Sequence, residues 1–101
     1  METITIKKAL VDGKDRHIKR GQLVLNDLGP SWGIELESGA DAGFETYSSG
    51  ADITVEIETG RGVLTGPAKV LRATKLSASV WKLEAFAMGP LMLGEEVFRA
   101  G

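Results

Sequence analysis

Hydrophobic and polar residues alternate with a period of two along much of the chain. The pattern is clearest from Asp52 to Glu58, where Ile53, Val55 and Ile57 fall on one face while threonine and glutamate side chains fall on the other. Such alternation is typical of a β-strand with one buried face. The same reasoning predicts further strands over residues 3–11, 18–26, 32–37, 63–74 and 77–88.

The first two of these strands are predicted to form a hairpin. Asp12-Gly13 supplies turn residues between them, and the strand before the turn places Ile4, Ile6 and Leu10 on one face. Farther along, Gly66-Pro67 interrupts a strand pattern. Because proline cannot donate a hydrogen bond to a neighbouring strand, this pair predicts a bulge or an edge position.

The chain is therefore predicted to be all-β. Thirteen glycines divide it into short segments, and no stretch shows sustained helical spacing with a cap at each end. We expect a small antiparallel β-barrel or sandwich of five to seven short strands with a long glycine-rich loop. The exposed strand edges of such a sheet need closure or pairing with a partner.

Two segments fall outside the strand pattern. Residues 38–51 are small, polar and rich in glycine, which predicts a mobile loop held in place by Phe44 and Tyr47. Residues 89–101 carry an apolar run that ends near Phe98, and they are predicted to form a C-terminal arm, either a docking segment or a single helical turn.

Length and composition limit the classes of protein. A chain of 101 residues supports one domain, here residues 1–101. No apolar run approaches the ~20 residues that span a bilayer, and no signal peptide is visible, so we expect no membrane insertion and a location in the cytoplasm or in a virion. There are no cysteines and one histidine, His17, which is expected to face solvent.

The near-neutral net charge of −2 conceals an uneven distribution. Residues 1–30 carry six basic and four acidic side chains, residues 31–60 carry seven acidic and no basic ones, and residues 61–101 carry six basic and three acidic ones. An acidic middle between basic flanks can meet the flanks of a neighbouring molecule. It also repels phosphate, which disfavours a nucleic-acid partner.

Candidate chemistry is sparse. Glu35 and Glu37 share one strand face, as do Glu56 and Glu58, and paired carboxylates of this kind either form a solvated outer face or bind a partner or a cation. Ser48-Ser49 has no base nearby in the sequence. We therefore expect no catalytic residues, no metal site and no cofactor, and a protein that is not an enzyme.

Residues 64–93 resemble the closing hairpin of major tail tube proteins of long-tailed bacteriophages. The resemblance lies in Gly66-Pro67-Ala68-Lys69-Val70, Lys75-Leu76-Ser77-Ala78-Ser79 and Leu83-Glu84-Ala85-Phe86-Ala87-Met88-Gly89-Pro90-Leu91. It implies a structural subunit of a phage tail or another virion component, in which the sheets of neighbouring subunits continue one another.

A second segment resembles the PilZ domains, six-stranded barrels that bind cyclic di-GMP and act on protein partners. Residues 25–36 resemble the family's turn of Asp/Asn, Ser and Gly between two strands, with Asp27, Ser31 and Gly33 as the corresponding residue types, and Arg16 and Arg20 have the spacing of its arginine motif. The resemblance implies a signalling adaptor, either responsive to cyclic di-GMP or degenerate.

The first interpretation is a non-enzymatic assembly domain that forms a homo-oligomer or docks on another structural protein. Its expected interface draws on the glutamate pairs, the aromatic residues of the long loop and the apolar tail, which are Glu35, Glu37, Phe44, Tyr47, Glu56, Glu58, Leu91, Leu93 and Phe98. The alternative is the PilZ-like adaptor, and only this alternative involves cyclic di-GMP.

Overall fold

The computed structural model describes residues 2–26 and 31–98 and confirms an all-β fold. The strands form one antiparallel sheet and are β1 (Glu2–Val11), β2 (Lys14–Asp15), β3 (Arg20–Leu25), β4 (Trp32–Gly39), β5 (Asp52–Thr59), β6 (Gly62–Ser77), β7 (Val80–Ala87), β8 (Met92–Leu93) and β9 (Glu96–Val97). Two 3-10 helices, η1 (Ala40–Ala42) and η2 (Phe44–Thr46), separate β4 from β5. None of the helices in this described part is long and apolar enough to cross a membrane.

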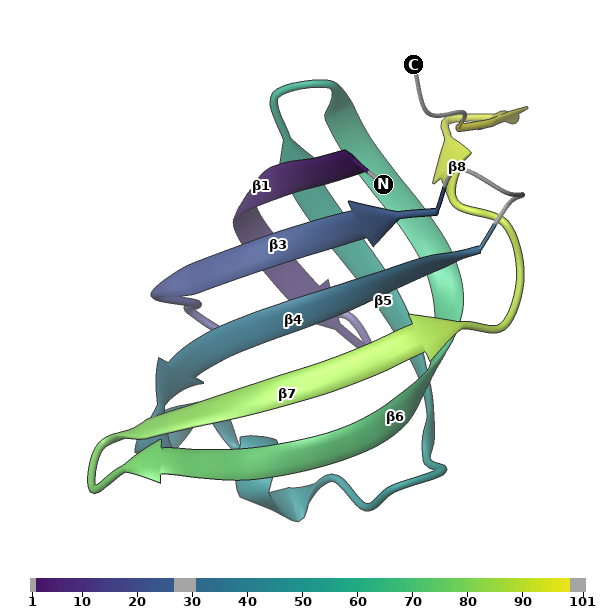
Figure 1. The fold of residues 1–101 in the computed structure, drawn as a ribbon. Coiled ribbons are helices and arrows are strands. Elements are labelled where there is room, and N and C mark those ends of the chain that lie inside the picture. Colours follow the sequence, from purple (N-terminus) through teal and green to yellow (C-terminus); the bar gives the residue numbers. More distant parts are fainter. Residues whose placement is uncertain (1, 27–30, 99–101) are drawn as a thin grey trace.

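Six of the strands pair in a circuit that returns to its start. The order is β1-β3-β4-β7-β6-β5, and β5 pairs again with β1. Strand β1 joins the two ends of the circuit because its first residues, 2–5, pair with β3 and its later residues, 6–11, pair with β5. Figure 1 shows the resulting curved sheet wrapped around a central space, which side chains fill. This closure removes most of the open edges that the sequence left to be covered.

An irregularity in β1 corrects the predicted face of this strand. Its register against β5 shifts between Ile6 and Lys8, so one extra residue is inserted there. Because the insertion reverses the alternation, Ala9 and Val11 follow Ile6 into the core, and Leu10 does not. Leu10 is only half-buried and lines a hollow on the outside of the sheet.

Elsewhere the alternation holds. Along β5 every second residue from Ile53 to Thr59 is buried and the residues between are exposed. The inward residues of β3, β4, β6 and β7 join them in one core, in which Leu23, Ile34, Leu36, Ile57, Leu64 and Leu83 are among the largest fully buried side chains. The prediction of half-buried strands is confirmed for this part of the barrel.

The 16-residue strand β6 pairs with β5 along its first half and with β7 along its second. The bulge predicted at Gly66-Pro67 is absent, since the register against β5 runs without a shift from Gly62 to Lys69. The predicted alternative, an edge position, fits better. Pro67 pairs with Thr54 of β5 on one edge, and on the other edge it falls between Thr65, which pairs with β8, and Ala68, which pairs with β7. The register shifts in β6 occur later, where Leu71 and Leu76 are the extra residues.

The long segment between β4 and β5 is more regular than predicted. Ser38 and Gly39 belong to β4, and η1 and η2 follow directly. Phe44 is fully buried, and the backbone of residues 50–51 forms two hydrogen bonds with Val70, of 2.8 and 2.9 Å. The 3-10 helices lie at the lower end of the barrel in Figure 1 and cover that end of the core.

The C-terminal arm covers the other end of the core. The predicted helical turn is absent, because β8 and β9 form a small hairpin that adds to the edge of β6 within the same molecule. Leu91 is only 2% exposed, and its carbonyl accepts a hydrogen bond of 2.8 Å from the Phe98 backbone. Trp32 donates its indole N–H to the Gly89 carbonyl at 2.9 Å. Residues 99–101 of the predicted arm lie outside the described part.

Candidate interaction surfaces

Charged side chains form cross-strand rows on the outer face of β4, β7 and β6. Lys82 on β7 lies 3.2 Å from Glu35 on β4 and 3.7 Å from Glu84 on its own strand. Arg72 on β6 pairs with the other oxygen of the Glu84 carboxylate. The hydrogen bond to Glu35 and the neighbouring carboxylates raise the pKa of Lys82 despite some desolvation. Part of the acidic middle of the sequence thus meets the basic C-terminal flank within one molecule.

This pairing changes what Glu35 and Glu37 offer a partner. Glu35 is half-buried and engaged with Lys82. Glu37 lies between Arg20 on β3 and Lys82 on β7 in the strand register. Because these charges face opposite charges on neighbouring strands of the same chain, this outer face is close to neutral and carries little unbalanced charge for a partner to meet.

The outer face of β1, β5 and β6 differs because two exposed carboxylates, Glu56 and Glu58, lie near a single ammonium, that of Lys8, which is opposite Glu58 in the strand register. Glu56 and Glu58 are exposed on β5, and neither makes an ion pair with another residue of the described ranges. They line a shallow hollow of about 110 Å³ together with Lys8 and Leu10 from β1 and Val63 from β6. The predicted interface residues of β5 therefore lie in a concave part of the surface.

Apolar side chains continue this face toward the C-terminus. Val63 is 46% exposed, and Thr65, two residues on, pairs with Met92 of β8, which pairs with Val97 of β9. Paired residues in an antiparallel sheet share a face, so Met92 and Val97 point outward beside Thr65. Val97 is 44% exposed. We call this region the β5 face, comprising Lys8, Leu10, Glu56, Glu58, Val63, Thr65, Met92 and Val97.

A second exposed apolar region lies on the far half of β6. The bulge residues Leu71 and Leu76 are 47% and 50% exposed. From residue 71 onward, β6 pairs with β7 on one edge only, and no strand among residues 2–26 and 31–98 covers the other edge. In Figure 1 this half of β6 runs with β7 into the hairpin at the lower left.

Several predicted interface residues are in the interior instead. Phe44 and Leu91 are 0% and 2% exposed, so these two are not surface residues, and their apolar area is used by the chain's own core. Tyr47 and Phe98 are partly buried and pack against that core. Leu93 is the tail residue of the prediction that stays exposed, at 41%.

The neighbourhood of Arg16 is a structural cluster. Its guanidinium donates to the Ala42 carbonyl at 2.9 Å, hydrogen-bonds the Tyr47 hydroxyl and lies 5.2 Å from the Tyr47 ring centre. Burial raises the pKa of Tyr47, and the nearby Arg16 charge opposes this shift. These contacts attach the segment of η1 and η2 to the chain that follows β2.

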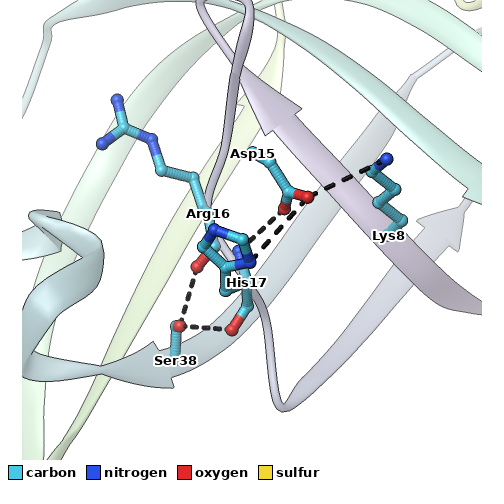
Figure 2. Close-up of polar contacts among 5 residues, drawn as sticks. All are labelled: Lys8, Asp15, Arg16, His17 and Ser38. Atoms are coloured by element: carbon cyan, nitrogen blue, oxygen red, sulfur yellow. Dashed lines mark hydrogen bonds and ion pairs between the residues drawn. The ribbon is translucent and has the colours of Figure 1, made fainter.

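Figure 2 shows how the backbone around Arg16 is fixed. The Ser38 hydroxyl lies 2.9 Å from the Arg16 carbonyl and 2.8 Å from the His17 carbonyl. The Asp15 carboxylate accepts the His17 backbone N–H at 2.9 Å and also lies 3.9 Å from the Lys8 ammonium. His17 has a left-handed backbone with φ of 49°, and its side chain is 83% exposed, as the sequence predicted.

The other residues of the PilZ resemblance are dispersed. Arg20 is exposed at the start of β3, Ser31 is exposed before β4, and Gly33 is half-buried in β4. Asp27 lies outside the described part of the chain. Arg16 is directed to Tyr47 and Ala42, so one residue of the predicted arginine pair already has partners within the chain.

Sequence reasoning missed Val63, Leu71 and Leu76 as surface residues. Aliphatic residues in a strand pattern are expected to be buried, and here two of them are placed outside by bulges. A signal was present in β6, since residues 70–76 break the period of two and place leucines next to Arg72 and Lys75.

Among the described residues, no three His, Cys, Asp or Glu side chains group as a metal site. Comparisons with family models, curated proteins and solved structures found no match for the chain.

Proposed function

We propose that this chain is a non-enzymatic assembly domain that self-associates through the outside of its barrel. The observation that carries the proposal is the position of its exposed large apolar side chains. All of them within the described ranges lie between residues 63 and 97, and they are Val63, Leu71, Leu76, Phe86, Met88, Leu93 and Val97. Scattered single apolar residues are ordinary on a protein surface, but these lie on strands that neighbour one another in the sheet, β7, β6, β8 and β9, or directly after β7, which favours a contact region.

The same third of the chain supports a more specific role. The resemblance to phage tail tube proteins covers residues 64–93, which span most of β6, all of β7 and β8. These strands carry most of the exposed apolar side chains. We therefore propose a tail or other virion component as the setting of this assembly, with another structural protein as the alternative partner.

Mass measurement tests this function. Light scattering coupled to size exclusion should give a mass above the 10.8 kDa of one chain, and the mass should rise with loading concentration. The paired substitution Val63→Thr and Val97→Thr keeps residues that suit strands and removes apolar area, so it should lower the mass. A mass of one chain at every concentration would contradict self-association.

The PilZ-like adaptor is a second candidate, favoured by the closed circuit of six strands. The PilZ resemblance implies a barrel with this number of strands. Calorimetry with cyclic di-GMP tests it, and binding should be lost in Arg20→Ala, an exposed position whose replacement leaves the core intact. An absence of heat at micromolar concentrations would remove the ligand from this candidate.

A further inference from the structure

The hollow on the β5 face combines two kinds of recognition chemistry. Leu10 and Val63 supply apolar surface, and Glu56 and Glu58 supply two carboxylates. Lys8 also lines the hollow and lies opposite Glu58 in the strand register, but its ammonium is shared with Asp15 at 3.9 Å, so the lining holds two carboxylates and one ammonium. The excess of negative charge beside apolar side chains suits an occupant that carries an aliphatic group next to a cation.

The far end of β6 presents that combination. Lys75 and Leu76 are adjacent and both exposed, and Leu76 is the extra residue of a bulge. Lys75 makes no ion pair with any residue of the described ranges, whereas the nearby Arg72 is held by Glu84. A bulge displaces a side chain from the regular strand surface, which makes the leucine available for contact.

One molecule cannot bring these two features together. Val63 of the hollow and Leu76 at the far end belong to the same continuous strand, β6, and lie thirteen residues apart along it (76 − 63). At roughly 3.3 Å per residue the strand holds them well apart. Both ends of β6 are further fixed by pairing, to β5 at one end and to β7 at the other. Lys75 and Leu76 can therefore reach such a hollow only on a second copy.

We propose that Lys75 and Leu76 of one copy dock in the hollow of the β5 face of a second copy. This inference rests on the proposed self-association and identifies its two surfaces. Leu76 packs against Leu10 and Val63, and the Lys75 ammonium meets the carboxylates of Glu56 and Glu58. Unbalanced charge of opposite sign on the two surfaces steers the encounter and sets the orientation.

The contact is head-to-tail because the two surfaces are different parts of the molecule. An open assembly therefore has one unoccupied hollow, on the copy at one end, and one unoccupied β6 end, on the copy at the other end. A contact of this type closes into a ring if its rotation permits and otherwise grows as a filament. The protein should therefore assemble beyond a dimer as its concentration rises.

Charge reversal tests the two surfaces separately and together. Lys75→Glu places an acid against Glu56 and Glu58, and the paired substitution Glu56→Lys with Glu58→Lys places bases against Lys75. Each variant alone should self-associate about tenfold or more weakly in sedimentation velocity, because like charges then face each other. Mixing the two variants should restore assembly, since each hollow then meets an opposite charge on the other variant. Lys19→Glu, at an exposed position that belongs to neither surface, makes the same charge change as Lys75→Glu and should have no effect.

Folding is checked for each variant by circular dichroism. If the double lysine variant does not fold, Glu56→Gln with Glu58→Gln and the separate Leu76→Ser provide the test, and both should weaken assembly. An unmodified chain that assembles while every one of these variants assembles equally well would overturn the docking site and leave self-association standing. A monomeric unmodified chain would overturn self-association itself.

Discussion

Gly66 is the position at which the packing of Trp32 and the C-terminal arm against β6 can be tested most sharply. A Cβ atom added there would lie 3.0 Å from Trp32 Cζ2, 3.1 Å from the Pro90 carbonyl oxygen and 3.3 Å from Leu91 Cδ2. All three contacts are tighter than ordinary van der Waals separations, and one of them involves backbone. Gly66→Ala must therefore displace the segment that covers this end of the core.

The expected cost follows from two opposing effects. Overpacking of a close-packed core costs about 1–3 kcal/mol. Replacing glycine with alanine restricts the unfolded chain, which stabilises the folded state by about 0.4–1 kcal/mol. We expect Gly66→Ala to lower the free energy of unfolding by roughly 1–2 kcal/mol, a sizeable part of the ~5–15 kcal/mol that is usual for a domain.

Gly60→Ala is the matched control. A Cβ at Gly60 meets nothing within 4 Å, and its backbone is not left-handed. This substitution should be neutral or stabilising by up to about 1 kcal/mol. Urea unfolding followed by tryptophan fluorescence should shift the midpoint of Gly66→Ala downward by about 1 M relative to the unmodified chain, given a slope of about 1–3 kcal/mol/M. Equal midpoints for the two variants would refute the close approach of Trp32 and Leu91 to β6.

Three further predictions concern stability and association. Phe44→Ala should lower the free energy of unfolding by about 3–5 kcal/mol, because the ring is fully buried. Glu45→Ala, at the exposed neighbouring position, should change it little. Equal effects of the two substitutions in urea unfolding would contradict the burial of Phe44. The single tyrosine, Tyr47, should titrate above pH 10.0 by ultraviolet absorbance in the folded chain and near 10.0 in urea, because burial raises its pKa. The free energy of unfolding should therefore fall as the pH rises from 10.0 through the folded pKa. The same titration midpoint in the folded and the urea-unfolded chain would contradict the burial of Tyr47. Self-association should weaken as the salt concentration is raised, because ions screen charges beyond about 8 Å at physiological ionic strength. An association constant that does not change with salt would indicate that apolar contacts alone hold the copies together.

The strands were predictable from the sequence where the alternation is unbroken. In β5, Ile53, Val55 and Ile57 share the buried face because nothing interrupts their period of two. In β1, Leu10 was assigned to the wrong face because one inserted residue reverses the alternation, and local sequence carries no clear mark of it. The position of this bulge depends on the pairing of β1 with β5, a strand distant in the sequence, so it requires the tertiary structure.

The candidate surfaces were less predictable for the same reason. The glutamates of β4 were expected to be available to a partner, but Glu35 meets Lys82, a residue brought beside it only when β4 pairs with β7. Glu56 and Glu58 were correctly placed outside, because this depends on the alternation of β5 alone. The tail was predicted to be a docking segment or a helical turn, since its apolar residues follow neither strand nor helix spacing clearly enough to assign. Leu91 finds its partners in the core around β6.

Sedimentation equilibrium of the unmodified chain, over a wide range of concentrations, tests self-association most directly. The weight-average mass is predicted to exceed 10.8 kDa and to increase with concentration beyond the mass of a dimer. A mass that stays at 10.8 kDa across the whole range would contradict it.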